Sequence, residues 1–299
     1  MLQSRQLAAI MFTDIVGYTT LMGNDEQNAF TLLNKNGQLQ DQLIMKSIFV
    51  IILFIFTCLP GRTQTLPELG NNKPEKIFNG KNLNGWYQIT DNKGTDKNLF
   101  SVENETIHVY PSQDVKSTQS FGAIITEKEF QNYVLTFEYK WGEKKFKPRD
   151  EYVRDAGVLI HMFGENIIWP SGIECQIQEG DTGDLWIIKT KASTKVHPMN
   201  KNYDVAGEIR TLGAPNEYNR FPRSYCWEKP EWNKIVLVVK GDHAQFYIND
   251  KLVNEAIDMK KWDPGQDKWI PLTKGKILLQ AEGSEIFYRN ITVLDLKTE

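Results

Sequence analysis

Alternation of apolar and polar residues constrains the fold of this chain more strongly than any other feature of its sequence. In the stretch YVLTFEYKW every second residue is large and apolar, namely Tyr133, Leu135, Phe137, Tyr139 and Trp141. Successive side chains of a β-strand point to opposite faces, so these residues would share one face of a half-buried strand. Similar short runs continue from about residue 75 to the end of the chain. The pattern predicts a protein built mainly from β-strands.

Turn signals divide this region into short strands. We expect a hairpin over Glu103-Asn104-Glu105, turns at Gly241-Asp242 and Asn249-Asp250, and a closing hairpin about Glu282-Gly283-Ser284. No stretch after residue 75 shows the 3.6-residue period of a helix longer than about 10 residues. Many strands without crossover helices predict an antiparallel β-sandwich of the jelly-roll kind.

The composition excludes several classes of protein. Charged residues make up 24% of the chain, aromatic residues 11%, and the net charge is −3. The basic residues form no extended run, so the sequence lacks the electrostatic signature of a nucleic-acid-binding protein. The three cysteines, Cys58, Cys175 and Cys226, have no C-x-x-C spacing, so we expect neither a zinc site nor a disulfide framework.

An apolar segment interrupts the chain at residues 43–61, LIMKSIFVIILFIFTCLPG. Lys46 follows Met45, an uncharged apolar stretch comes next, and the segment ends in Pro60-Gly61, which is the layout of a secretory signal peptide. The apolar part is shorter than the roughly 20 residues that span a bilayer, so no stable membrane span is expected. A buried strand or helix is the alternative interpretation. We predict a signal peptide at 45–64, a linker at 65–74, and export to the periplasm or beyond the cell, with lipid attachment at Cys58 left open.

Residues 1–44 have a different character. An apolar strand over residues 7–12 ends at Asp14, and Asn24-Asp25-Glu26 caps a helical pattern, which predicts a short βα fragment. The motif FTDIVGYTT resembles the opening of a class III adenylate or guanylate cyclase catalytic domain. The resemblance implies that Asp14 would bind the catalytic metal ions. It stops at Ile44, before the family's other catalytic residues, so we interpret 1–44 as a truncated fragment and expect no cyclase activity.

The stretch SGIECQIQ, residues 171–178, predicts a strand with two unlike faces. Three residues on one face are apolar and three on the other are polar, respectively Ile173, Cys175, Ile177 and Glu174, Gln176, Gln178. The polar face has two interpretations. It is either exposed to solvent, or it binds a sugar, with Trp169 and Trp186 near it in sequence to stack on the sugar ring.

A resemblance to a known family covers nearly all of residues 75–299. The motifs IFNGKNLNGWY, FQNYVLTFEYKWGE, RDAGVLIHMFG, WPSGIECQIQEGDTGDLWII and GKILLQAEGSEIFYRNI occur in the order seen in the 3-keto-disaccharide hydrolase domain family. The resemblance implies an exported, concanavalin A-like jelly roll. It also implies cleavage of 3-keto-glycosides or 3-keto-disaccharides that a partner oxidoreductase has already oxidised at carbon 3.

This chemistry assigns expected roles to polar residues of the domain. A ketone acidifies the neighbouring hydrogen, so the reaction needs a base, an acid and a group that stabilises the enolate. We expect Glu174 to be the base or acid, with His161 and Glu282 as candidates for the complementary role. The candidates for substrate binding are Gln176, Gln178, Gln280, Arg154, Arg289, Trp169 and Trp186. We predict no cofactor, and a divalent metal is left open.

Each assignment has a plainer alternative. His161 fits a histidine at the edge of the core, Glu282 a solvated turn residue, and Arg149 and Arg154 ordinary loop charges. The turn GDTGD (180–184) offers two carboxylates, fewer than the roughly 6–8 oxygens that Ca²⁺ takes, so no metal is expected there. At the level of function, the alternative is a carbohydrate-binding jelly roll without catalysis, because a fold does not determine an activity.

Overall fold

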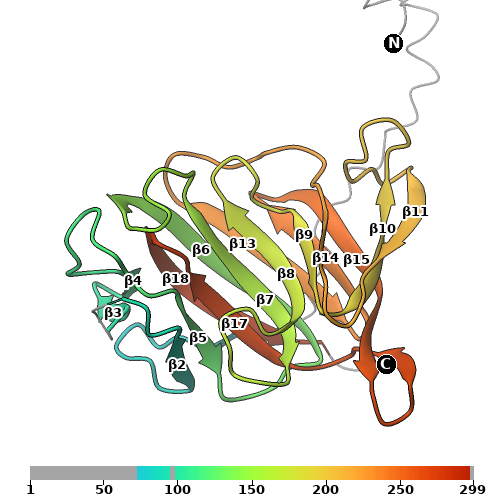
Figure 1. The fold of residues 1–299 in the computed structure, drawn as a ribbon, viewed down its shortest axis with the longest axis horizontal. Coiled ribbons are helices and arrows are strands. Elements are labelled where there is room, and N and C mark those ends of the chain that lie inside the picture. The colour runs from blue at the N-terminus through green and yellow to red at the C-terminus, as the bar shows by residue number, and fades with distance from the viewer. Residues whose placement is uncertain (1–72, 95–97, 297–299) are drawn as a thin grey trace, which may run out of the picture. The chain divides into compact units, whose positions relative to one another are not determined.

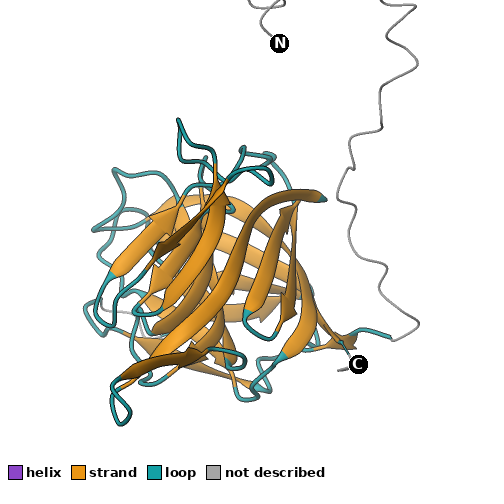
Figure 2. Ribbon diagram, turned by 90° about the vertical axis from the view of Figure 1, so that its right-hand side faces the viewer, coloured by secondary structure: helices purple, strands orange, loops and turns teal. Residues whose placement is uncertain are grey.

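A computed structural model describes residues 73–94 and 98–296 of the chain. These residues form 18 strands and no helix, so within them there is no helix that could cross a membrane. The strands form two antiparallel sheets that lie face to face as a sandwich (Figure 1). A second view shows the twisted strands of both layers (Figure 2). The fold class predicted for the main domain is confirmed, whereas the cyclase-like fragment and the apolar segment lie outside the described residues.

The larger sheet has eleven strands. They are β1 (Glu75–Lys76), β3 (Phe100–Glu103), β4 (Thr106–Val109), β6 (Asn132–Lys145), β10 (Lys191–Val196), β11 (Glu208–Leu212), β13 (Asn233–Lys240), β14 (His243–Ile248), β15 (Lys251–Asp263), β16 (Lys268–Pro271) and β18 (Ser284–Asp295). Their order is β11-β10-β15-β14-β13-β6-β18-β4-β3, with β1 paired to β18 and β16 paired to β15.

The smaller sheet has seven strands. They are β2 (Trp86–Thr90), β5 (Gly122–Thr126), β7 (Asp155–Phe163), β8 (Ser171–Gln178), β9 (Leu185–Ile188), β12 (Tyr218–Phe221) and β17 (Lys276–Ala281). Their order is β12-β9-β8-β7-β17-β5-β2, which places β7 and β8 in the middle of the sheet.

The main core lies between the two sheets, and the alternating residues supply it. Tyr133, Leu135, Phe137 and Tyr139 of β6 are buried there, and Trp141 packs against it. From the other sheet, β8 contributes Ile173, Cys175 and Ile177 to the same core. The predicted faces of both strands are therefore confirmed. Cys175 is a buried free thiol and Cys226 an exposed one, so the two do not pair.

The predicted turns fall where the sequence places them, with one correction. Asn104 and Glu105 connect β3 to β4 with φ angles of 48° and 58°, the left-handed conformation of a tight hairpin turn. The expected hairpin about Glu282-Gly283-Ser284 is wrong, because β17 belongs to the smaller sheet and β18 to the larger one. This turn carries the chain from one sheet to the other. Gly283 allows it, since its φ is +77° and a Cβ there would lie 3.2 Å from the Phe146 carbonyl oxygen.

Candidate active site

Three carboxyl groups lie together on the face of the smaller sheet that points away from the main core. They belong to Asp155 at the start of β7, Glu174 in β8 and Glu282 just after β17, and each residue is 4–5% exposed. β7 and β8 are adjacent, with Asp155 opposite Gln178 and Leu159 opposite Glu174. Because residues directly opposite each other share a face, the pairing gathers the polar side chains of both strands on one side.

Gly157 makes room for this cluster. It lies in β7 opposite Gln176, and a Cβ at Gly157 would collide with Glu174 Oε1 and Gln280 Oε1. The carboxyl group of Glu174 and the amide of Gln280 therefore lie directly over the glycine backbone. Gln280 Oε1 is buried without a hydrogen-bond partner among the described residues. A side chain at position 157 would displace both groups.

Hydrogen bonds and one ion pair orient the carboxyl groups. Gln176 Nε2 donates to Asp155 Oδ1 over 2.6 Å, and Arg149 forms an ion pair with Asp155. Trp169 Nε1 donates to Glu282 Oε1 over 2.5 Å. The carboxyl groups of Asp155 and Glu282 also interact with each other, so the titration of one depends on the charge of the other.

Burial makes these carboxyl groups weaker acids than usual. It raises the pKa of Glu282 to about 7, helped by the negative charge of Asp155. It raises the pKa of Asp155 to about 6, against the opposing effect of the Arg149 charge. The pKa of Glu174 is raised well above its usual value by burial first and then by the charges of Glu282 and Asp155. Near neutral pH the cluster therefore contains both a proton donor and a proton acceptor.

No functional role was predicted from the sequence for two of the central residues. Asp155 and Arg149 lie in the segment RDEYVRDAG, which reads as an ordinary charged loop before a strand. Asp155 is two residues before Gly157 and four before Leu159, so strand alternation places all three on one face. This alternation is visible in the sequence, but it indicates a site only once β7 is known to pair with β8.

Both tryptophans expected to stack on sugar are at the cluster. Trp186 lies opposite Glu174 on the neighbouring strand β9, with the Arg220 guanidinium 5.7 Å from its ring centre. Trp169 comes from the connection between β7 and β8 and contacts the edge of Phe121 at 5.7 Å between ring centres. Trp169 is 36% exposed, whereas Glu282 beneath its indole N–H is buried. The tryptophan thus covers one wall of the cluster.

Three expected site residues lie elsewhere. His161 is fully buried at an irregularity of β7, where its Nε2 donates to the Gly241 carbonyl oxygen over 2.8 Å and burial lowers its pKa. Its surroundings match the core-edge alternative. Arg154 is bound to Glu179 and donates to the Gly142 carbonyl oxygen. Arg289 lies on the larger sheet, paired with Glu138. None of the three contacts the carboxyl cluster.

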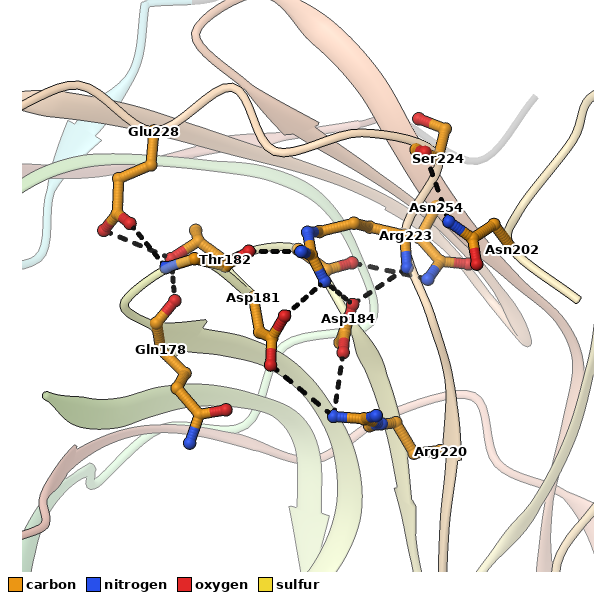
Figure 3. Close-up of polar contacts among 12 residues, drawn as sticks. Gln178, Asp181, Thr182, Asp184, Asn202, Arg220, Arg223, Ser224, Glu228 and Asn254 are labelled. Atoms are coloured by element: carbon orange, nitrogen blue, oxygen red, sulfur yellow. Dashed lines mark hydrogen bonds and ion pairs between the residues drawn. The ribbon is translucent and has the colours of Figure 1, made fainter. Parts of the chain in front are cut away.

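The two aspartates of the turn GDTGD form ion pairs with arginine side chains of the same chain. Arg223 pairs with both Asp181 and Asp184 at 2.8 Å, and Arg220 contacts the same two carboxylates (Figure 3). The Asp181 backbone N–H donates to the Gln178 carbonyl oxygen over 2.8 Å, so this network fixes the end of β8 that faces Asp155. Among the described residues no group of three or more His, Cys, Asp or Glu side chains is arranged to hold a metal ion.

Comparisons with known proteins identify the family. Two structures from Parabacteroides distasonis ATCC 8503, both provisionally named glycosyl hydrolases, are 20% and 19% identical, with TM-scores of 0.46 and 0.45. The alignments cover 75% and 74% of this chain and 100% and 93% of those chains. A carbohydrate binding module from Bacillus subtilis is 11% identical, with a TM-score of 0.40, 71% of this chain covered and 96% of that one. At these values the structural likeness says nothing about activity.

No curated protein matches the chain. A family model described as the 3-keto-alpha-glucoside-1,2-lyase-like domain matches residues 73–294, which is most of the chain and almost all of its described part. This match confirms the family predicted from the sequence motifs, and the chain belongs to the carbohydrate-active family of 3-keto-alpha-glucoside-1,2-lyase-like domains.

Proposed function

We propose that this chain cleaves the glycosidic bond of 3-keto-glycosides, with the carboxyl cluster as its acid–base machinery. One observation carries the proposal: the carboxyl groups of Asp155 and Glu282 are buried in the same cluster, and this burial raises their pKa values to about 6 and about 7. Such a pair holds one proton near neutral pH. One member can therefore accept a proton while the other donates one.

In the proposed reaction the ketone at carbon 3 acidifies the hydrogen on carbon 2. The ionised member of the pair takes this proton, a double bond forms between carbons 1 and 2, and the bond from carbon 1 to the aglycone oxygen breaks. The protonated member gives its proton to the departing oxygen, so the pair holds one proton before and after the step. Addition of water across the double bond then gives net hydrolysis.

The other groups of the cluster have supporting roles in this proposal. Burial raises the pKa of Glu174 well above its usual value, which favours the protonated carboxyl, and in this proposal that carboxyl donates a hydrogen bond to the developing enolate oxygen. Arg149 adds a positive charge beside Asp155. The hydroxyl groups and ring faces of the sugar are contacted by Gln176, Gln178, Gln280, Trp169 and Trp186. An oxidoreductase supplies the ketone beforehand, so the elimination itself needs no electron acceptor. Export remains part of the proposal on the basis of the apolar segment 43–61.

The test is incubation of the purified protein with a 3-keto-glucoside and with 3-keto-trehalose, following sugar release by NMR. We expect release by the parent protein and losses of about 10²-fold or more in Asp155→Asn and Glu282→Gln. Glu174→Gln tests the enolate role, and Arg289→Gln, on the other sheet, is the matched control with unchanged activity. Added EDTA tests for a contribution by a divalent cation. Absence of release from both keto sugars would refute the proposal, and binding without release would favour the carbohydrate-binding alternative.

A further inference from the structure

Two adjoining cavities lie on the larger sheet. One has a volume of about 520 Å³ and the other about 230 Å³, and both are lined by Lys140 of β6 and Phe287 of β18. Because they share these residues, we treat them as one depression, the Lys140 groove. Lys140 and Phe287 lie opposite each other on adjacent strands, so they share a face of the sheet.

The Lys140 groove is separate from the carboxyl cluster. The neighbours of Lys140 and Phe287 along their strands, Tyr139 and Tyr288, are buried in the core between the sheets. Strand alternation therefore points Lys140 and Phe287 outward, away from the smaller sheet. No residue of the carboxyl cluster lines either cavity.

Fixed aromatic surfaces form part of the groove. The Arg289 guanidinium lies 3.8 Å from the ring centre of Trp232, and Glu138 holds that arginine through a 2.8 Å hydrogen bond from its Nε. Phe287 stacks on His108 with 4.2 Å between ring centres. The rings of Trp232 and Phe287 are thus each packed against a side chain that other residues of the protein hold in place. A ligand that packs on these rings would not have to order them first.

Further contacts hold the support of Phe287 in place. His108 Nε2 contacts Glu285 Oε1 at 2.8 Å, and Nδ1 contacts Glu103. The backbone N–H groups of Glu143 and Lys144 donate to Glu285 Oε2 over 3.0 and 3.2 Å. The carboxylate of Glu285, which lines the larger cavity, is therefore engaged by the protein and fixes His108 beside Phe287.

The ammonium group of Lys140, in contrast, is held only weakly by the protein and can donate hydrogen bonds to a ligand. Its side chain is 34% exposed, and its Nζ is 3.7 Å from Glu231, whose side chain is 80% exposed. A surface ion pair of this kind contributes little to stability and is readily replaced. The same Nζ lies 5.5 Å from the ring centre of Trp232 and 5.9 Å from that of Phe287. A carboxylate and two aromatic rings therefore lie within about 6 Å of the Lys140 ammonium group.

We propose that the Lys140 groove binds a pyranose oligosaccharide, at a site apart from the carboxyl cluster. The C–H groups on the face of a pyranose ring pack on aromatic rings, and its hydroxyl groups can accept from Lys140 and donate to Glu231. The volume of the larger cavity lies within the roughly 300–1,000 Å³ of small-ligand sites. Its three basic and three acidic lining residues balance, which favours an uncharged sugar over a polyanion.

The test uses the full chain and sugars that carry no ketone, so that its result is independent of the proposed reaction. Glucose oligosaccharides of two to six units with α-1,4, β-1,3 or β-1,4 linkages are titrated and followed by calorimetry and tryptophan fluorescence. We expect at least one to bind, and Trp232→Ala and Lys140→Met to weaken this binding roughly tenfold. Trp262→Ala, an aromatic truncation in the β15–β16 hairpin, is the matched control with unchanged affinity. Circular dichroism checks that each variant is folded.

Glu174→Gln locates the bound sugar. Binding that survives Glu174→Gln and weakens in Trp232→Ala places the ligand in the groove. Binding that is lost in Glu174→Gln and kept in Trp232→Ala would overturn the proposal, because the sugar would then be at the carboxyl cluster. Absence of binding by every oligosaccharide at millimolar concentration would also overturn it.

Discussion

At the scale of single residues, the main effect in this protein is that burial changes acid strength. Asp155 and Glu282 are almost fully shielded from water, and the Arg149 ion pair and the hydrogen bonds from Gln176 and Trp169 do not offset the loss of hydration for both charges. The result is a carboxyl pair that titrates near neutral pH.

The raised pKa of Glu282 predicts a pH dependence of stability. Its carboxyl has a pKa of about 7 in the folded protein, against an ordinary value of 4.5. Between about pH 4.5 and 7 the folded state binds more protons than the unfolded state, so the free energy of unfolding falls as pH rises. Glu282→Gln should flatten this dependence, as measured by urea unfolding at several pH values. An equal slope in both proteins would contradict the assignment.

Tyr110 predicts a second effect at this scale, because its hydroxyl fixes the backbone on both sides of Glu282. It lies 3.1 Å from the Ala281 carbonyl oxygen and accepts from the Gly283 N–H over 3.0 Å. Tyr110→Phe should lower the free energy of unfolding by about 1–3 kcal/mol, because it leaves a buried N–H unpaired. Tyr133→Phe is the control, since the Tyr133 hydroxyl is buried without a hydrogen-bond partner among the described residues. Equal losses in the two variants would refute this explanation.

At the scale of elements, the position of the carboxyl cluster depends on how strands are connected. Glu282 is buried because β17 and β18 enter different sheets, whereas a hairpin would have left it in solvent. The turn between β8 and β9 is equally important, since it carries the aspartates that bind Arg220 and Arg223. These connections hold the ends of the strands that meet at the cluster.

The β8–β9 turn predicts a marked loss of stability on removal of Asp184. Its side chain is 1% exposed and pairs with Arg223 and Arg220. Asp184→Ala should lower the free energy of unfolding by about 1–3 kcal/mol, because the part-buried Arg223 backbone N–H loses its acceptor and the Arg223 guanidinium keeps Asp181 but loses its buried partner. Asp250→Ala, which breaks the exposed pair with Lys234, should cost about 1 kcal/mol or less. Denaturant unfolding of both variants measures the difference, and similar losses would contradict it.

At the scale of the whole molecule, the sandwich presents two outer faces with different chemistry. The smaller sheet carries buried carboxyl groups for which we propose catalysis, and the larger sheet carries an aromatic groove with nearly balanced charge. The two faces can be altered independently, since their residues do not overlap. Because the two sites are separate, the experiments on turnover and on sugar binding can be interpreted independently of each other.

Much of the fold could be predicted from local sequence. The alternation in β6 and β8 and the turns at Asn104-Glu105 and Asn249-Asp250 appear in the structure, and the described residues after residue 75 contain no helix, as expected from the lack of a helical period. Of the residues expected in the site, Glu174, Glu282, the three glutamines and both tryptophans lie on or beside one cluster. His161, Arg154 and Arg289 do not, because residue type alone gives no direction to a side chain.

The sequence by itself determined which residues face inward along each strand, because a strand has a period of two that depends only on the local backbone. The tertiary structure alone decided that Asp155, Glu174 and Glu282 meet, and that the last turn crosses between sheets. Pairing of strands far apart in sequence is fixed by packing of the whole core, and this energy is not encoded in any single segment.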